Sequence, residues 1–397
     1  MMAGTGMPER GRVYLDHAAT TPLRPEVREA WLAAHDVIGN ASSIHGAGQD
    51  ARRVLEDARE RLAAVLGCQP IEVVFTSGGT EAIGLALQGL WRARTDGADA
   101  VVLPDGEHHA TLDTVGWIGA HEGAHVIPVG LDAVGRIPVA AFAVAVAEPR
   151  VALATAIVAG NESGTINDAS ALSRAAADAA VPLHLDAVAA FGRIPVAFDR
   201  WRGDAPAGAG LVALSVSGHK LGAPVGTGAL VVSRTARLEP LLHGGGQQRG
   251  LRAGTQDVPG AVALATAAEL AAAERETEAV RLAALRDDFL RDLRSALPEA
   301  ELLGDPVDRL PGTIHLLLPG AAGESLLFLL DQEGIALSTG SACQAGVAEP
   351  SHVVLAMGRT EREARQVLRI SLGRTTQRAD LDALHRALPA AYRRLVR

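Results

Sequence analysis

The segment Ile71-Glu72-Val73-Val74-Phe75-Thr76-Ser77-Gly78-Gly79-Thr80-Glu81 decides the fold class of this chain. Residues 71–75 form a short apolar run of the kind that makes a buried strand, and a glycine-rich turn follows directly. From Glu81 to Arg94 the apolar residues recur at helical spacing. A buried strand that passes through a turn into a helix is the building unit of a parallel sheet covered by helices on both faces.

The same alternation continues on both sides of this segment. Asp50 to Leu66 predicts an amphipathic helix that ends at Gly67. Downstream, short apolar runs predict further strands, and helices such as Ala169–Ala180 lie between several of them. These runs are Val101–Leu103, Val126–Val129, Val151–Val158, Leu183–Asp186, Leu211–Val216 and Ala229–Ser233. We therefore expect an α/β protein with a mostly parallel sheet up to about residue 260.

The pattern changes in the last third of the chain. Val258–Ala296 predicts one long helix or two, rich in Ala, Leu, Glu and Arg. Strand and helix candidates then alternate, at Thr313–Leu318, Glu324–Gln332, Ile335–Leu337, Glu361–Val367 and Leu368–Ser371. We expect a large domain of residues 16–260 and a small α+β domain made of residues 1–15 and 261–397.

Composition and charge exclude several classes of protein. The 397 residues are 48% hydrophobic and 21% charged, which permits a large core and excludes wholesale disorder. A net charge of −9 argues against general nucleic-acid binding. Apolar runs are too short for a transmembrane helix, and Met1–Arg12 lacks the apolar core of a signal peptide. Two cysteines, Cys68 and Cys343, make no disulfide framework, so we expect a protein of the reducing cytoplasm. From the charge and the short apolar runs we expect it to bind neither nucleic acid nor membranes.

One lysine, Lys220, stands against 36 arginines. Codon bias in a GC-rich genome explains the scarcity of lysine but not why this one is retained. Arginine cannot replace a lysine whose neutral amine must act as a nucleophile, because guanidinium stays protonated above pH ~12. Lys220 ends the run Ser215-Val216-Ser217-Gly218-His219-Lys220 after an expected strand. Burial there lowers the pKa of an amine and frees it for Schiff-base chemistry, although an ordinary loop lysine is the alternative.

Two more features suggest a ligand site at the ends of strands. The turn Ser77–Glu81 precedes a helix, whose amino terminus attracts anions, and Thr80 adds a hydroxyl; a plain turn is the alternative. Asp186 ends the expected strand of His184-Leu185-Asp186, at the edge where open α/β sheets bind ligands. It could hold a cationic ring nitrogen or simply cap a helix. No phosphate-binding or dinucleotide loop motif is complete.

The two cysteines differ in their surroundings. Cys343 lies among the small residues of Ser338–Gly346, a loop pattern that gives a catalytic cysteine the exposure it needs. Cys68 follows the end of a helix and precedes Pro70, which indicates a residue without a catalytic role. 

A possible zinc motif occurs at His121-Glu122-Gly123-Ala124-His125, which matches the pattern of zinc peptidases. That chemistry requires an unbroken helix carrying both histidines. Gly119 and Gly123 are expected to interrupt the helix, and Val126–Val129 predicts a strand directly afterwards. We therefore expect no metal site.

Taken together, these features indicate a pyridoxal-phosphate enzyme that acts on sulfur. The chain resembles the cysteine desulfurases of the NifS/IscS-like branch, in the class V aminotransferase family, from Tyr14 to about Arg374. The matching runs are Tyr14–Pro22, Gly39–His45, Thr76–Ala82, Glu107-His108, Asn161-Glu162, His184–Ala187, Ser217–Lys220, Arg252–Thr255, Gly340–Cys343 and Arg369–Arg374. The resemblance implies the fold type I of pyridoxal-phosphate transferases, with a seven-stranded, mostly parallel sheet in the large domain and a homodimer whose subunits share the active site.

The resemblance also implies roles for individual residues around pyridoxal 5'-phosphate. Lys220 would bond to the cofactor and later move the Cα proton of the substrate. Asp186 would pair with the pyridinium nitrogen and keep the ring an electron sink. His108 would stack on the ring and transfer protons, and Asn161 would bond to its phenolic oxygen. The phosphate would be held by Gly79, Thr80, Ser217 and His219, and by Thr255 of the other subunit.

For the substrate, the resemblance implies L-cysteine held by its carboxylate on Arg369, with help from Asn40. The thiolate of Cys343 would attack the substrate sulfur, leaving L-alanine and a persulfide on Cys343. That sulfur would pass to an acceptor protein for iron–sulfur clusters, thiolated tRNA or cofactors.

The chain departs from the family pattern at a few positions. Ala189 stands where the family usually has a glutamine near the phenolic oxygen, and His17 and Gly160 stand where it usually has asparagines. About 23 residues follow Arg374, so we expect no long tail for docking an iron–sulfur scaffold. A C–S lyase of the same fold, which would not need Cys343, and a partner-binding scaffold without turnover, which Ala189 slightly favours, remain alternatives.

Overall fold

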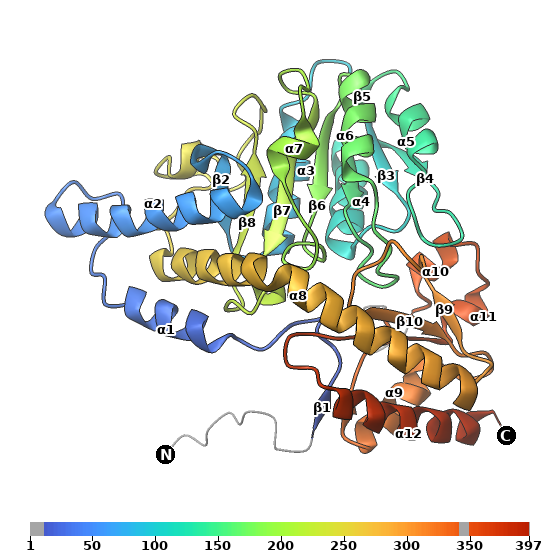
Figure 1. Cartoon of the computed structure of the whole chain (residues 1–397). Helices are drawn as coiled ribbons and strands as arrows, with labels where there is room; N and C mark the ends of the chain where they lie inside the picture. Colours follow the sequence, from blue (N-terminus) through green and yellow to red (C-terminus); the bar gives the residue numbers. More distant parts are fainter. Residues whose placement is uncertain (1–11, 341–348, 397) are drawn as a thin grey trace.

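The computed structural model describes residues 12–340 and 349–396, and its centre is a seven-stranded sheet (Figure 1). The strands, in spatial order, are β2 (Val73–Thr76), β8 (Gly228–Val232), β7 (Gly210–Ser217), β6 (Pro182–Asp186), β5 (Val151–Ile157), β3 (Ala100–Pro104) and β4 (His125–Val129). β8 pairs antiparallel with both of its neighbours, and the other strands of the sheet run parallel to one another. The mostly parallel sheet predicted from the sequence is confirmed.

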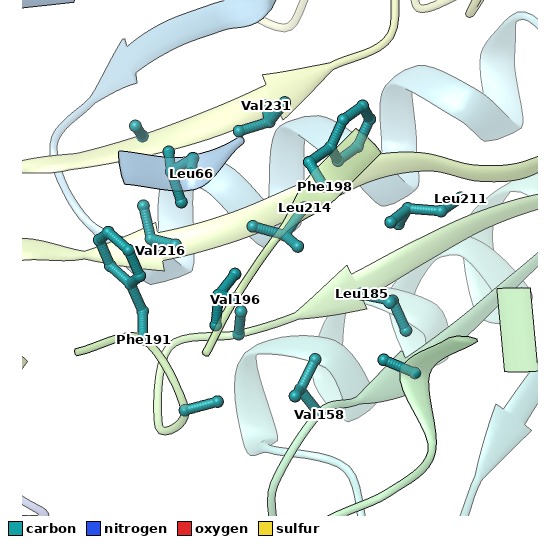
Figure 2. Close-up of a cluster of buried hydrophobic side chains, with 14 of the residues drawn as sticks. Leu66, Val158, Leu185, Phe191, Val196, Phe198, Leu211, Leu214, Val216 and Val231 are labelled. Carbon is teal, nitrogen blue, oxygen red and sulfur yellow. The ribbon is translucent and has the colours of Figure 1, made fainter. Parts of the chain in front are cut away.

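The central strands are buried on both faces. In β7, Leu214 and Val216 belong to one apolar cluster, which Figure 2 shows in part, and Val212 belongs to the cluster on the opposite face. The first face is covered by α2 (Gly46–Leu66), α5 (Val139–Val146), α6 (Ala169–Asp178), α7 (Phe198–Arg202) and the first part of α8 (Val258–Ala296). The second face is covered by α3 (Gly79–Arg92) and α4 (His109–Glu122). Continuous apolar runs at these strands follow from this double coverage.

A second apolar body is built from the carboxy-terminal part of the chain. Its antiparallel sheet has the order β12-β10-β9, and a short parallel pair joins β1 to β11. Figure 1 shows this body below the large sheet, with β1, β9, β10 and α12 labelled. The elements are β1 (Val13–Tyr14), β9 (Glu301–Leu303), β10 (Thr313–Leu317), α9 (Gly323–Gln332), β11 (Ile335–Ala336), α10 (His352–Ala356), α11 (Glu361–Ala364), β12 (Val367–Ser371) and α12 (Arg378–Leu395). Leu15, Ile314, Ile370 and Leu384 contribute to its core, so the amino-terminal segment is part of this body.

The structure corrects several predicted boundaries. The strand expected at residues 71–75 begins at Val73, because Pro70–Glu72 forms a 3₁₀ turn. The helix expected at Glu361–Val367 is only the short α11, because Val367 already pairs in β12. The helix after the glycine-rich turn begins at Gly79, two residues earlier than expected.

The long helix α8 is one helix of 39 residues. Its buried residues up to Ala271 pack in the core of the large sheet, and those from Phe289 to Leu293 pack in the second core. The predicted domain division at residue 260 remains a prediction. We propose that the two bodies divide inside α8, between Ala271 and Phe289. In the described ranges, no helix has both the length and the apolar character needed to cross a membrane.

Candidate active site

A cavity of about 440 Å³ lies where the carboxyl ends of β5, β6 and β7 meet the second body. From the body of the large sheet come Thr80, His108, Asp186, Ser217 and Lys220, and from the second body come Ser338, Gly340, His352 and Arg369. Polar groups from elements far apart in sequence therefore converge on one cavity, as in most small-molecule sites.

The cavity gathers nine of the residues singled out from the sequence. These are Gly79, Thr80, His108, Asn161, Asp186, Ser217, His219, Lys220 and Arg369, and Ala189 lies beside them. Asn40 and Thr255 are exposed and do not line the cavity of the single chain. Cys343 lies outside the described residues.

Lys220 ends the 3₁₀ turn Gly218–Lys220 that follows β7. Its amine donates hydrogen bonds to the carbonyl oxygens of Ala18 and, at 2.8 Å, Ala19. Burial, together with the positive charges of Arg193 and Arg369, lowers the pKa of Lys220 from 10.5 to about 7. A substantial fraction of the amine is therefore neutral near pH 7 and able to act as a nucleophile.

Asp186 is the last residue of β6 and is almost fully buried. Its Oδ1 accepts a hydrogen bond from the backbone N–H of Val188 at 2.8 Å. Burial raises the pKa of Asp186 to about 6, against the lowering effect of that hydrogen bond and of Lys220. Asp186 is therefore a carboxylate at neutral pH, and a cationic ligand group would stabilise it further.

Glu107 is a second carboxyl group close to Asp186. It is fully buried, and its Oε1 accepts a hydrogen bond from the N–H of Ile157 at 2.6 Å. Burial and the negative charge of Asp186 hold the pKa of Glu107 well above its usual range. Burial thus disfavours the charged form of Glu107, and Asp186, with its pKa of about 6, is the carboxylate that lines the cavity.

His108 caps the amino terminus of α4, where its Nδ1 accepts a hydrogen bond from the N–H of Ala110 at 3.1 Å. Burial, followed by the charge of Lys220, lowers the pKa of His108 to about 4. The ring is therefore neutral at pH 7, and its remaining proton is on Nε2, because the Nδ1 atom is the acceptor.

The opposite end of the cavity is suited to an anion. The helix α3 begins at Gly79, and its N-cap Gly78 has φ 151°, a conformation that residues with a side chain rarely adopt. A Cβ at Gly79 would lie 2.8 Å from a methyl carbon of Val188, so the close approach requires glycine. Gly79 at this helix terminus, together with Thr80, Ser217 and His219, lines the cavity, and a helix amino terminus favours an anion. The anion site suggested by the sequence stays a prediction.

Arg369 lies on β12 and is 5% exposed. Its Nη2 pairs with Asp16 Oδ1 at 3.0 Å, and its Nη1 donates to the carbonyl oxygen of Asn161 at 3.2 Å. The Nε atom is buried without a hydrogen-bond partner in the described part of the chain. A buried N–H group without a partner is costly, so this edge of the guanidinium is ready for an acceptor such as a carboxylate.

Sequence reasoning missed several residues of the cavity. Arg193, which donates to the carbonyl oxygen of His17 at 2.9 Å, and the paired rings of His109 and His352 line it as well. No local motif marks them. Asp16, which contacts Arg369, does belong to the matched run Tyr14–Pro22, but 353 residues separate the two partners and no pattern connects them.

The zinc-like sequence pattern and Cys68 can also be placed in the structure. Gly123, with φ 76°, ends α4 before His125 opens β4, so the two histidines of the zinc pattern do not share a helix. Gly119, in contrast, lies within α4 and does not interrupt it. No metal-binding cluster of His, Cys, Asp or Glu occurs among the described residues. Burial raises the pKa of the half-buried Cys68, which keeps it a thiol at neutral pH.

The two bodies, the mostly parallel seven-stranded sheet and the lysine after β7 define a protein of the fold type I of pyridoxal-phosphate transferases. The chain belongs to the aminotransferase class-V family, whose model matches residues 13–384. It is 46% identical over 387 residues to an IscS-like cysteine desulfurase of Mycobacterium tuberculosis, with 96% of each chain covered. It is 37% identical over 388 residues to the cysteine desulfurase IscS of Methanosarcina thermophila, covering 98% of this chain and 93% of that one.

Solved structures show the same relationship. A NifS-like protein superimposes with a TM-score of 0.88 at 31% identity, over 97% of this chain and 100% of its own. DndA from Streptomyces lividans superimposes with a TM-score of 0.74 at 34% identity, over 90% of this chain and 99% of its own. The family and the NifS/IscS-like branch predicted from the sequence are confirmed.

Proposed function

We propose that this protein is a pyridoxal-phosphate-dependent cysteine desulfurase, which converts L-cysteine to L-alanine and transfers the sulfur to Cys343. One observation carries the proposal. The single lysine of the chain lies in the cavity with its pKa lowered to about 7, and both a buried carboxylate, Asp186, and a guanidinium, Arg369, line the same cavity. The desulfurases among the relatives are consistent with it.

The residues present fit pyridoxal 5'-phosphate. The amino terminus of α3, Thr80, Ser217 and His219 would hold its phosphate, and Asp186 would face its ring nitrogen. The amide of Asn161 would meet its phenolic oxygen, and the Oδ1 atom of this amide is buried without a hydrogen-bond partner among the described residues. We propose that Thr255 of a second subunit completes the phosphate site.

When bound, pyridoxal phosphate supplies an electron sink that stabilises negative charge at the carbon bearing the amino group. The neutral amine of Lys220 provides the attachment point and, once free, a base for the proton on that carbon. Asp186 keeps the positive charge on the ring nitrogen, because a buried carboxylate strongly favours a cationic partner. His108, neutral and carrying its proton on Nε2, can deliver a proton within the cavity.

Arg369 would recognise the carboxylate of the substrate. A carboxylate that docks on its unpaired Nε edge would gain a charge-assisted hydrogen bond and satisfy a buried donor at the same time. We propose that L-cysteine binds in this way and that Asn40 assists.

The sulfur step balances without an external oxidant or reductant. The Cβ–S bond of L-cysteine breaks, its electron pair remains with carbon, and Cβ gains a proton to give L-alanine. The Cys343 thiolate forms a bond to the departing sulfur, which leaves a persulfide. We propose that a homodimer in the cytoplasm carries out this step and passes the sulfur to an acceptor protein that supplies iron–sulfur clusters, thiolated tRNA or cofactors.

The decisive experiment is to incubate the purified holoprotein with L-cysteine, with and without a reductant, and to assay alanine, sulfide and the persulfide on Cys343. Alanine should form in stoichiometric amount without reductant and catalytically with it. The chain offers a matched pair of variants, because it has two cysteines: Cys343→Ser should abolish alanine formation, and Cys68→Ser should leave it unchanged.

Two results would contradict the proposal. A wild-type protein that forms no alanine from L-cysteine would exclude desulfuration. A Cys343→Ser variant that still acts on a sulfur amino acid at the wild-type rate would identify the protein as a C–S lyase instead, because elimination does not need the second thiol.

A further inference from the structure

Asp16 occupies a fixed position between the two bodies. The backbone of Asp16 forms an isolated β-bridge with Ser371. Its carbonyl oxygen accepts hydrogen bonds from the Tyr14 hydroxyl at 3.0 Å and from the N–H of Ala19 at 3.1 Å. The neighbouring Leu15 is fully buried in the second core. The backbone therefore holds the Asp16 carboxylate at one place, and the carboxylate itself remains free to pair.

The partner of this carboxylate is the guanidinium of Arg369, at 3.0 Å. Among the described residues, Asp16 is the one carboxylate within ion-pair distance of Arg369. The other bonded nitrogen, Nη1, meets the carbonyl oxygen of Asn161. Two contacts on Nη1 and Nη2 fix the plane of the guanidinium and leave the Nε edge, which has no partner, for a ligand.

The surroundings of Arg369 are otherwise positive or neutral. His315 is paired with Arg369 across β10 and β12 and is fully buried, and neither ring nitrogen has a partner in the described part of the chain. Burial and the charge of Arg369 lower the pKa of His315 to about 3, so it contributes no charge at neutral pH. Arg193 adds positive charge near Arg369. Without Asp16, the guanidinium would lose its ion-pair partner, and of its two described hydrogen bonds only that of Nη1 to Asn161 would remain.

We propose that Asp16 is a positioning residue for substrate recognition: its carboxylate orients Arg369 so that the Nε edge receives the α-carboxylate of the substrate. The inference rests on the proposed function, because it assumes an amino-acid substrate. It assigns to the amino-terminal segment a role in selecting ligands that carry a carboxylate.

The test compares two ligands that differ only in the carboxylate, L-alanine and ethylamine, neither of which carries sulfur to transfer. Their dissociation constants are measured from the absorbance change of the bound cofactor in the holoprotein. Asp16→Ala should weaken L-alanine binding by about tenfold or more, the size expected for a charge-assisted hydrogen bond, and change ethylamine binding less than about twofold. Asp16→Asn keeps an oxygen acceptor for Nη2 and should bind L-alanine within about threefold of wild type.

Asp382→Ala is the matched control, because it removes a carboxylate from an exposed pair with Arg378. It should leave both dissociation constants unchanged. If Asp16→Ala does not fold, Asp16→Ser, which is small and polar, takes its place with the same expected result.

Three outcomes would overturn the inference. Equal weakening of L-alanine and ethylamine would indicate a general structural role for Asp16, and unchanged binding of both would indicate no role. If the wild-type protein binds L-alanine no better than ethylamine, it does not recognise the carboxylate. That result would refute the proposed substrate class as well as the role of Asp16. Comparison with wild type therefore separates failure of the inference from failure of the function.

Discussion

The two walls of the cavity are built in different ways. On one wall, Asp186, Ser217 and Lys220 follow directly from buried strands, so the backbone of the central sheet sets their positions. On the other wall, Arg369 lies on an edge strand of the three-stranded sheet. Its guanidinium is held by side-chain and carbonyl contacts from Asp16 and Asn161.

The sheet wall carries the groups that would transfer protons, and the second wall carries the group that would recognise the substrate. Burial on the sheet wall moves the pKa values of Lys220 and Asp186 towards neutrality, as proton transfer near pH 7 requires. On the second wall, the property that matters is the direction in which the guanidinium of Arg369 points. A rigid sheet suits the first task, and a network of polar contacts between bodies suits the second.

The largest effect is expected on the sheet wall, at Lys220→Arg. Guanidinium can neither bond to the cofactor nor exchange the substrate proton, so alanine formation should fall by at least ~10²–10⁴-fold, the usual contribution of an acid–base group. The absorbance band of the bound cofactor should disappear. Borohydride reduction of the wild-type holoprotein, followed by peptide mapping, should place the cofactor on Lys220; retention of the band by the variant would refute the assignment.

The same residue predicts a pH dependence. Because burial lowers its pKa from 10.5 to about 7, the amine of Lys220 is protonated below pH 7 and neutral above it. The rate at which cofactor-free protein takes up pyridoxal phosphate should therefore rise as the pH increases through about 7 and then level off. A rate that continues to rise towards pH 10 would show that the amine is not desolvated. The measurement is stopped-flow absorbance across this range.

A smaller effect is expected on the recognition wall, at Arg369→Gln. The variant keeps a polar group but loses the charge and the paired donors, so kcat/KM for L-cysteine should fall by about 10- to 100-fold, mainly through KM. Arg378→Gln, on an exposed ion-pair network, is the control and should show no change. A fall confined to kcat would indicate that Arg369 acts in the chemical step instead.

The next prediction concerns how the second wall is supported. A Cβ at Gly373 would overlap the imidazole of His17, which lies in the segment that carries Asp16. Gly373→Ala should therefore lower the free energy of unfolding by about 1–3 kcal/mol, as overpacked sites do, and raise KM for L-cysteine.

Gly116→Ala provides the control, because a Cβ there meets no atom within 4 Å inside α4. It should raise the free energy of unfolding by about 0.5–1 kcal/mol, as alanine does over glycine in a helix. Denaturant unfolding measures both changes. Equal stability of the Gly373 and Gly116 variants would contradict the close packing on His17.

The smallest effect is expected at Ala189, which lines the cavity where the family usually has glutamine. Ala189→Gln would add a donor near the phenolic oxygen of the cofactor. We expect the pH titration of the cofactor absorbance to move to lower pH, because a donor stabilises the deprotonated, charged form, and turnover to change by less than about tenfold. An unchanged titration would show that this position does not contact the cofactor.

Local sequence patterns predicted much of the fold and one wall of the site. Buried strands, the glycine turn at Gly79 and the single lysine are each visible within a few residues. The partners of Arg369 were not predictable in this way, because Asp16 lies 353 residues away and ordinary aspartates are common. The sequence also predicted the end of α11 wrongly. Val367 belongs to β12 because it pairs with β10, and local helix propensity does not reveal that pairing.

The sequence by itself determined the fold class, because hydrophobic periodicity and glycine conformation act over short distances along the chain. Its ordered motifs determined the family, and they marked candidate residues at the ends of strands. Only the tertiary structure decided the lowered pKa of Lys220, the raised pKa of Glu107 and the pairing of Asp16 with Arg369. These depend on burial and on charges that folding brings together from distant segments of the chain.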